Sequence, residues 1–441
     1  MSGRGAVLAD GWVRRRRPRE RLLNHGHAWG IGEESLATTP DNAMEVVSTG
    51  LPPARQGAEC RLALAVADAN WYTTENLFGA IRRTDVSTLL LKCIDYYNAW
   101  QRGLPPWAWR RALHHRGPGL WEHDLVLPSG WMKRFPSLGM RPIERSIHRW
   151  RSAHAGIAPL VLVMTYPHYL YLRDMVRPDL HVYFNVDDYS QYWPRFASRV
   201  NVLERQAVRE ADLTVCVSSL RADELRAAIP EAAGKIRHLP HGSTDISLSD
   251  HPWERPAPAP DDLSSLPRPL LGYVGTLEDR IDWDLLTRLS LAFPRASIAI
   301  IGPASVHRRG AWCADFRRCA ARTNVHLLGR RPQGAIHRYN RAFDVCLIPY
   351  RTDHPFNKVC SPTKIMDYMG TGRPIVSTAL PECRLYEGLF HVASSNDDFI
   401  AAVGSILEAG SDDGRSSLRF DWARANTCGR VVERFLDWLP L

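Results

Sequence analysis

The sequence contains no apolar run of about eighteen residues, the length that a helix needs to cross a bilayer, so no transmembrane helix is expected. It also lacks the apolar core of a secretory signal, because the stretch LLNHGHAWGIG is too short and too polar. The nine cysteines show no paired metal-ligand spacing, and several lie inside apolar runs such as DLTVCVSS. These absences predict a protein of the reducing cytoplasm.

A nucleic-acid reading module is missing as well, although the net charge is +9. Much of this charge is concentrated in two segments, 14–21 and 132–154. In the second segment Ile143, Ile147 and Trp150 fall on one side of a helix among arginines. This pattern favours a peripheral position on an anionic membrane, on the inner face of the plasma membrane, while a solvated helix face explains the same charges equally well. No nucleic-acid partner is expected.

With 441 residues, 45% of them hydrophobic, the chain is long enough for two domains that each bury a full core. Residues 1–60 lack steady periodicity and are predicted to form a disordered basic tail. The proline-rich stretch at 251–266 predicts a linker. The linker separates an N-terminal domain at 61–250 from a C-terminal domain at 267–412, which is followed by a helical segment at 413–441.

Both predicted domains contain short apolar runs separated by helical lengths. The first contains RLALAVA, VSTLLLK, PLVLVMTY, HVYFNV, LTVCVSS and KIRHLP, and the second LLGYVG, SIAIIGP, NVHLLG, DVCLIPY and PIVST. Such alternation predicts α/β domains with parallel, doubly wound sheets. Ligands in such sheets bind beyond the carboxyl ends of the strands, so the residues at those ends are the candidates for a site.

The stretch SPTKIMDYMGTGRPIVST, residues 361–378, combines a helix start, a glycine stop and a buried strand. Ser361 is suited to cap the helix, and Thr363 and Lys364 belong to its first turn, whose free N–H groups attract anions. Asp367 lies three residues after Lys364 and is expected on the same helix face. A diphosphate followed by a sugar hydroxyl would suit this arrangement.

The same stretch resembles the donor-binding helix of group 1 glycosyltransferases of the family-4 type. The stretch VYFNVDDYSQYW is similar to the acceptor-domain signature of their bacterial polysaccharide-assembly subgroup. The resemblance implies the GT-B fold, in which two Rossmann-like doubly wound domains face each other across a cleft. It also implies that segment 413–441 returns to brace the N-terminal domain.

The resemblance assigns roles to particular residues. Asp187, Lys364 and Arg280 are the expected catalytic residues, with Asp187 where many relatives have a histidine. The expected donor-binding residues are Gly242, Gly275, Thr276, Arg280, Arg331, Ser361, Thr363, Lys364 and Asp367. The sequence departs from the family at Val359, where the first of two glutamates usually stands, and in its first loop, ADANWYTT.

The resulting hypothesis is a glycosyltransferase that moves a sugar from a nucleoside-diphosphate sugar to a hydroxyl of a glycan or glycolipid in polysaccharide assembly. Retention of configuration follows from the resemblance. No cofactor and no metal are expected, because cations and a helix terminus supply the positive charge that a metal would bring. A nucleotide-sugar 2-epimerase and a catalytically silent scaffold protein remain alternatives. The donor, the acceptor and the oligomeric state stay open.

Overall fold

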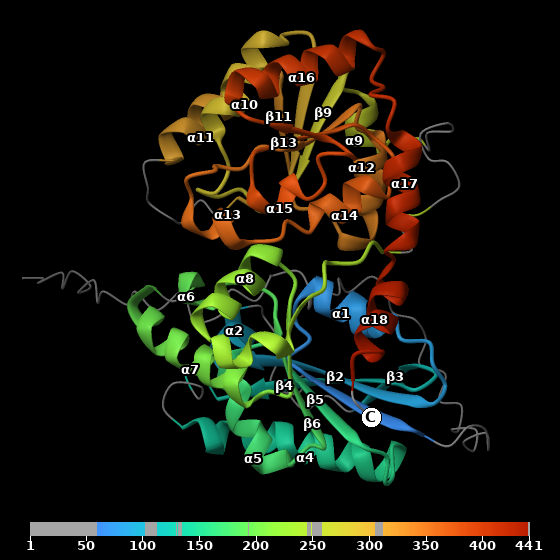
Figure 1. Ribbon diagram of the computed structural model, residues 1–441. Helices are drawn as coiled ribbons and strands as arrows, with labels where there is room; N and C mark the ends of the chain where they lie inside the picture. Colours follow the sequence, from blue (N-terminus) through green and yellow to red (C-terminus); the bar gives the residue numbers. More distant parts are fainter. Residues whose placement is uncertain are drawn as a thin grey trace, which may run out of the picture.

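The computed structural model describes residues 60–101, 113–128, 130, 135–192, 194–244, 248, 258–304 and 312–439. Within these ranges the chain forms two α/β domains, drawn one above the other in Figure 1, each with its own sheet. The predicted tail 1–60 lies outside the described residues except for Cys60. Of the predicted linker, 258–266 is described and contains the short helix α9 (Asp261–Ser264), where regular structure was not expected.

The first domain is built on an eight-stranded sheet, and long runs of its strand residues are buried because helices cover both faces. In spatial order the strands are β3 (His114–Gly117), β4 (Leu120–Leu127), β2 (Val86–Asp95), β1 (Leu62–Ala67), β5 (Leu160–Met164), β6 (Leu180–Asn185), β7 (Leu213–Cys216) and β8 (Ile236–His238). The helices are α1 (Tyr72–Gly79), α2 (Tyr96–Gln101), α4 (Pro136–His154), α5 (Leu172–Val176), α6 (Tyr189–Tyr192), α7 (Ala197–Glu210) and α8 (Ser219–Ala228). Short 3-10 turns lie at Pro167–Tyr171, Pro194–Phe196 and Pro230–Lys235.

The second domain contains a six-stranded sheet in which all neighbouring strands are parallel. In spatial order the strands are β11 (Val325–Gly329), β10 (Ser297–Ile301), β9 (Leu270–Val274), β12 (Val345–Ile348), β13 (Ile375–Thr378) and β14 (His391–Ala393). Besides α9, the helices are α10 (Trp283–Ala292), α11 (Trp312–Ala320), α12 (Ile336–Ala342), α13 (Pro355–Val359), α14 (Lys364–Met369), α15 (Pro381–Arg384), α16 (Asn396–Glu408) and α17 (Ser416–Ala425). A 3-10 turn at Gln333–Ala335 precedes α12.

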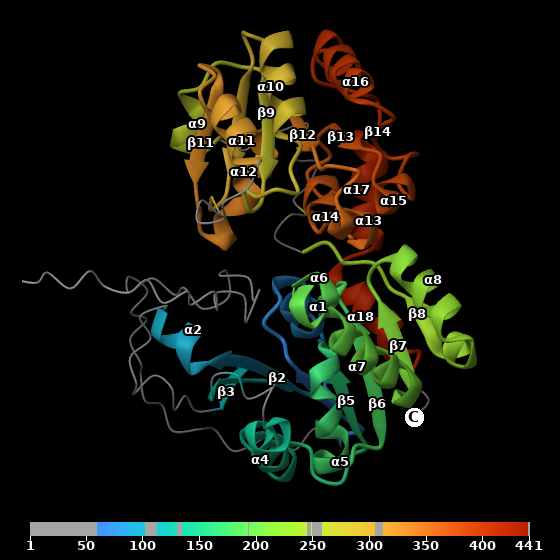
Figure 2. The same cartoon turned by 90° about the vertical axis from the view of Figure 1, so that its left-hand side faces the viewer.

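The last helix, α18 (Cys428–Leu436), lies in the first domain although the helix before it lies in the second. Figure 2 shows the same crossing from the side. Thr427 caps α18 by accepting a hydrogen bond from the Arg430 amide. The apolar side of α18 completes the core on one face of the first sheet, where Val431, Val432 and Phe435 are fully buried.

All eleven predicted strand runs form strands, but three strands were not predicted: β3, β4 and β14. The pair β3 and β4 makes the first sheet mixed, because β3 runs antiparallel at its edge, whereas a wholly parallel sheet was expected. These strands escaped prediction because LWEHDLVL carries polar residues inside the run and HHRG and HVA are very short.

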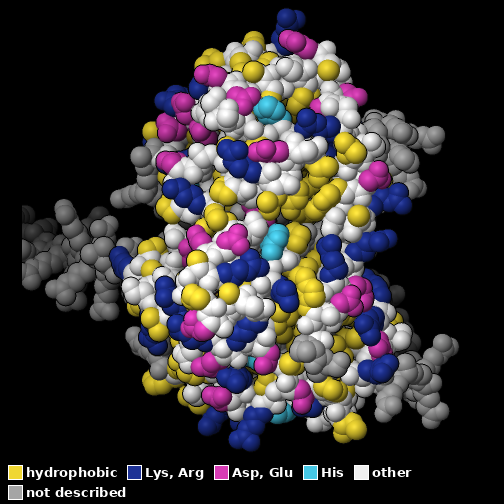
Figure 3. Space-filling model, in the orientation of Figure 1, with side chains coloured by type: hydrophobic (Ala, Val, Ile, Leu, Met, Phe, Trp, Pro, Cys, Tyr) yellow, Lys and Arg dark blue, Asp and Glu magenta, His cyan; other side chains and the backbone are white. Residues whose placement is uncertain are grey.

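The amphipathic pattern of segment 132–154 has a structural cause. In α4 the side chains of Ile143, Ile147 and Trp150 are fully buried in the core of the first domain, so they are not available to a membrane. The arginines of this helix face outward, and Figure 3 shows Lys and Arg side chains along the lower edge of the first domain. Within the described ranges no helix is both long enough and apolar enough to cross a membrane.

Candidate active site

Lys364 opens helix α14 at the edge of the second sheet that faces the first domain (Figure 1). Its Nζ donates a hydrogen bond of 2.5 Å to the Tyr350 hydroxyl, which follows β12. The same Nζ lies 4.7 Å from the centre of the Tyr350 ring and 5.0 Å from that of Tyr273, near the end of β9. Two aromatic rings therefore hold the lysine in one orientation.

Lys364 is nearly buried, because only 9% of the residue is exposed. The expected cap at Ser361 is wrong. Thr363 occupies the N-cap position without a side-chain hydrogen bond, while the Ser361 hydroxyl turns toward Glu382 at 3.5 Å. The helix, glycine and strand order of 361–378 is confirmed by α14 and β13.

The Gly275 turn meets Lys364 directly. A Cβ atom at Gly275 would lie 2.9 Å from Lys364 Nζ and 2.7 Å from the Tyr273 hydroxyl, and the φ of Gly275 is 152°. A side chain at this position would displace the lysine, so glycine leaves its charge open to a ligand. Thr276, the next residue, is exposed at the same turn.

Arg280 lies in the loop after β9 and contacts the same tyrosine as Lys364. Its guanidinium carbon is 5.6 Å from the Tyr350 ring centre and 4.3 Å from that of Phe356 in α13. Its Nε donates to Glu278 Oε1 at 2.6 Å, so one carboxylate partly balances its charge. Arg280 and Lys364 thus lie at Tyr350, and Gly275 lies beside Lys364; we call these three residues the cationic crevice.

Asp187 comes from the first domain, directly after β6. Its Oδ2 accepts a hydrogen bond of 2.8 Å from the Tyr192 hydroxyl, and its Oδ1 accepts one from the Asp188 amide. Burial raises the pKa of Asp187 to about 6, while the Tyr192 hydrogen bond and the charge of Arg280 act in the opposite direction. Tyr192, which binds Asp187, contacts Phe356 of the second domain, and Arg280 lies over the same Phe356 ring, so Asp187 and Arg280 approach this contact from opposite domains.

Aromatic side chains connect the two domains beside Asp187. Trp71, after β1, lies 5.9 Å from Tyr192, and Tyr192 meets Phe356 of the second domain edge to face at 5.4 Å. Tyr192, Phe356 and Tyr350 were not among the predicted site residues. A tyrosine at the end of an apolar strand run, as in DVCLIPY, is the signal that would have found Tyr350.

Asp367 does not share the environment of Lys364, although the helix spacing placed both on one face. Asp367 is half-buried. Burial raises the pKa of Tyr72, the first residue of α1 in the first domain, and the negative charge of Asp367 raises it further. Lys364 instead points between Tyr273 and Tyr350. Tertiary contacts therefore separate the two side chains. Thr363, also predicted in the donor turn, is exposed.

Two other predicted residues have structural partners away from the cationic crevice. Arg331 donates to Asp262 at 2.6 Å and to the Tyr339 hydroxyl at 3.0 Å, which joins the start of α12 to α9. At Gly242 a Cβ atom would lie 2.7 Å from the backbone of Cys428. Gly242 therefore permits the C-terminal segment to cross there, and its predicted role in donor binding stays a prediction.

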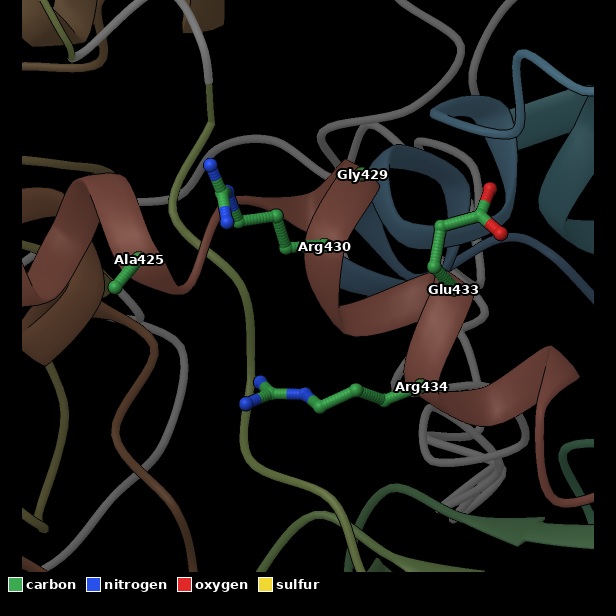
Figure 4. A pocket seen from close by; sticks show the side chains of 5 residues that line it. All are labelled: Ala425, Gly429, Arg430, Glu433 and Arg434. Atoms are coloured by element: carbon green, nitrogen blue, oxygen red, sulfur yellow. The ribbon is translucent and has the colours of Figure 1, made fainter.

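A separate surface hollow lies where α17 leads into α18. It has a volume of about 390 Å³ and is lined by Ala425, Gly429, Arg430, Glu433 and Arg434. Figure 4 shows the two arginines pointing to one side of α18 and Glu433 pointing to another. None of the predicted site residues lines this hollow, so it is distinct from the cationic crevice.

Comparison with known proteins identifies relatives of both sequence and fold. Residues 268–409 match the family described as "Glycosyl transferases group 1". The chain is 21% identical over 239 residues to "Putative teichuronic acid biosynthesis glycosyltransferase TuaH" of Bacillus subtilis (strain 168). This alignment covers 53% of the chain and 58% of the relative, so it spans somewhat more than half of that protein.

Among solved structures, sucrose-phosphate synthase of Thermosynechococcus elongatus has a TM-score of 0.62 at 13% identity, with 86% of this chain and 98% of that chain covered. HepE of Anabaena, solved in complex with UDP and glucose, has a TM-score of 0.58 at 13% identity, with 86% and 100% covered. These likenesses confirm the predicted GT-B fold of two facing α/β domains.

The match over 268–409 includes Gly275, Arg280 and Lys364, the residues of the cationic crevice, and it ends directly after α16. The resemblance that the stretch 361–378 predicted is therefore confirmed. Residues 268–409, which form most of the second domain, match the group 1 glycosyl transferase family, and the two domains together have the GT-B fold.

Proposed function

We propose that this protein is a glycosyltransferase that moves a sugar from a nucleoside-diphosphate sugar to a hydroxyl of a glycan or glycolipid, in polysaccharide assembly. The observation that carries the proposal is the cationic crevice. Lys364 Nζ lies so close to Gly275 that a Cβ atom there would be 2.9 Å from it, and both Lys364 and Arg280 contact Tyr350. Two cations beside a glycine turn suit a diphosphate. The carboxyl end of a parallel sheet is where α/β proteins bind such ligands.

Charge development on the leaving group is the step that these residues would assist. The bond between the anomeric carbon and the diphosphate oxygen breaks, and its electron pair leaves on that oxygen. Lys364 and Arg280 stabilise the growing negative charge without first reorganising, because aromatic rings and Glu278 hold them in place. The crevice supplies positive charge from side chains alone, so we propose a reaction that needs no metal.

The acceptor oxygen then forms the new bond to the anomeric carbon, and its proton passes to the departing phosphate oxygen on the same face of the sugar. This geometry retains the anomeric configuration, as the family resemblance implies. Asp187 lies near the crevice on the side of the first domain, because its partner Tyr192 contacts Phe356 beside Arg280, and its ionised form would accept a hydrogen bond from the acceptor hydroxyl and orient it. The aromatic contact between Tyr192 and Phe356 would help to exclude water, which would otherwise hydrolyse the donor.

A donor screen tests the proposal. UDP-, GDP- and TDP-sugars are added separately and the melting temperature is measured, since a ligand that binds only the native state raises it. UDP-sugars are tested first, because HepE is solved with UDP and glucose. We expect at least one donor to raise the melting temperature and to be turned over only with a glycan or glycolipid acceptor. Turnover of the donor to its 2-epimer without any acceptor would show an epimerase, and binding without turnover would show a scaffold protein.

We further propose an anionic membrane surface as a partner, through the outer face of α4. Arg141, Arg145 and Arg149 are exposed on this helix, and Phe135 and Leu138 at its start are 65% and 61% exposed. Arginines beside exposed apolar side chains suit anionic headgroups. We expect cosedimentation with phosphatidylglycerol vesicles but not with phosphatidylcholine vesicles, and loss of binding when the three arginines are replaced by glutamate. Equal binding of the glutamate variant would remove α4 from the interaction.

A further inference from the structure

Glu382 is a buried carboxylate at the boundary between the two domains that none of the preceding roles uses. It belongs to α15 of the second domain, and only 1% of the residue is exposed. Figure 1 shows α15 directly above α8 of the first domain, and the two helices are in contact. A buried carboxylate is stable only where hydrogen-bond donors surround it, so its partners matter.

The donors on one side come from the first turn of α8. The Ser219 amide donates to Glu382 Oε2 at 3.0 Å, and the Ser219 hydroxyl donates to the same oxygen at 3.2 Å. Amides in the first turn of a helix have no acceptor within the helix. Ser218, the N-cap residue, accepts from the Arg221 amide. The acceptor of the Ser219 amide is therefore supplied by the other domain, and its negative charge lies at the positive end of a ten-residue helix.

The other carboxylate oxygen faces the stretch that leads into the cationic crevice. The Ser361 hydroxyl donates to Glu382 Oε1 at 3.5 Å, and His238 Nε2, at the end of β8, lies 3.6 Å from the same oxygen. His241 is buried nearby and is hydrogen-bonded to the backbone of Ser361. Glu382 thus connects the first domain with a residue three positions before Lys364.

We propose that Glu382 is an interdomain latch, a positioning residue that holds the cationic crevice in register with the strand ends of the first domain. The latch consists of Glu382, Ser219 and Ser361. Because GT-B proteins bind donor and acceptor on different domains, the latch sets the alignment of the two substrates rather than the affinity for the donor alone. The expected effect of the latch on turnover rests on the proposed function, but its hydrogen bonds between the two domains do not.

Amide hydrogen exchange at Ser219 tests the latch without any substrate. In Glu382→Ala we expect the Ser219 amide to exchange roughly tenfold faster or more, because it loses a hydrogen bond to a charged group. Glu382→Gln keeps the shape and one acceptor, so a smaller acceleration is expected. Glu387→Ala is the matched control, since Glu387 lies five residues on, is exposed and pairs with Arg384. Exchange at the wild-type rate in Glu382→Ala would overturn the proposal.

A second variant approaches the latch from the first domain. Ser219→Pro removes both donors, and proline is tolerated at the first position of a helix because that amide has no partner in the helix. We expect Ser219→Pro and Glu382→Ala each to lower kcat roughly tenfold, with no further loss in the double variant, since both changes remove one interaction. The shift of melting temperature caused by the donor is expected to stay unchanged.

Each alternative result has its own meaning. Additive losses of kcat in the double variant would show that the two residues act separately, and an equal loss of donor binding would place Glu382 in the donor site; either result overturns the latch. If the wild-type protein turns over no donor, the proposed function fails, but the exchange experiment still decides whether the latch exists.

Discussion

Lys364 is the residue on which the proposed chemistry depends most. We predict that Lys364→Met lowers kcat by roughly 10²-fold or more, the effect of removing one preorganised electrostatic partner. Methionine fills the space between Tyr273 and Tyr350, so the folded state should persist. Steady-state kinetics and circular dichroism measure both effects. Lys358→Met is the control, because Lys358 is exposed on α13; wild-type kinetics in Lys364→Met would remove the lysine from the site.

Asp187 predicts the pH dependence of the reaction. Its pKa is raised to about 6 by burial, so at pH 5 only about a tenth of it is ionised. If the ionised form orients the acceptor, kcat/KM should fall about tenfold between pH 8 and pH 5. Tyr192→Phe removes a hydrogen bond that lowers this pKa and should move the midpoint to higher pH. A profile that stays the same in Asp187→Asn would assign the titration to another group.

Among the elements, α18 supplies core residues to the first domain although it follows the second domain in sequence. Phe435 of this helix lies edge to face against Phe78 and Phe184, with ring centres 5.4 Å and 6.2 Å away. We predict that Phe435→Ala lowers the free energy of unfolding by about 3–5 kcal/mol, through lost burial and the cavity that remains. Urea denaturation measures the change. Leu418→Ala on α17, where the leucine is 53% exposed, should cost far less; equal costs would contradict the packing role of α18.

For the molecule as a whole, the cationic crevice predicts independence from divalent metals. Lys364 and Arg280 neutralise the same charge that a metal ion would neutralise, so one solution makes the other unnecessary. We expect turnover to persist in excess EDTA after adventitious metal has been removed. Loss of turnover with the chelator and its return with Mg²⁺ or Mn²⁺ would refute the assignment of the diphosphate to this crevice.

The pH dependence of stability is a second property of the whole molecule. Burial lowers the pKa of His241 to about 4, so between about pH 6.5 and pH 4 the unfolded state binds more protons and stability falls as pH falls. Burial also lowers the pKa of His181 to about 4, so this histidine likewise makes stability fall as pH falls. Asp68 and Asp187 have the opposite effect on stability. Burial raises their pKa values to about 7 and about 6, so the folded state binds more protons and their contribution to stability is lost as pH rises.

A substitution of His241 isolates its contribution to the pH dependence of stability from the opposite contributions of Asp68 and Asp187. We predict that His241→Asn reduces the change in unfolding free energy between pH 7 and pH 5 by about 2 kcal/mol relative to wild type. Urea denaturation at both pH values measures this change. His148→Asn, at an exposed position on α4, should leave it unaltered. An unaltered pH dependence in His241→Asn would show that the histidine is not buried in the neutral form.

The sequence by itself determined the elements whose signal is local. Eleven apolar runs became strands, and nine of them are buried almost throughout, because strands buried on both sides of a sheet read as continuous apolar stretches; β8 and β11 are the two that are largely half-buried or exposed. The stretch 361–378 likewise encodes its own helix, glycine stop and strand, together with the family resemblance. The strands β3, β4 and β14 depended on pairing with neighbours, which no local pattern reveals.

Only the tertiary structure decided which side chains meet. Helix periodicity placed Lys364 and Asp367 on one face, but Tyr273 of β9 and Tyr350 after β12 hold the lysine inward, while the charge of Asp367 acts on Tyr72 of the first domain. The same holds for Gly242, whose neighbour Cys428 is 186 residues away in sequence. The latch at Glu382 joins residues of two domains. Contacts between distant segments depend on how the elements pack, and this packing is a property of the whole chain rather than of any stretch within it.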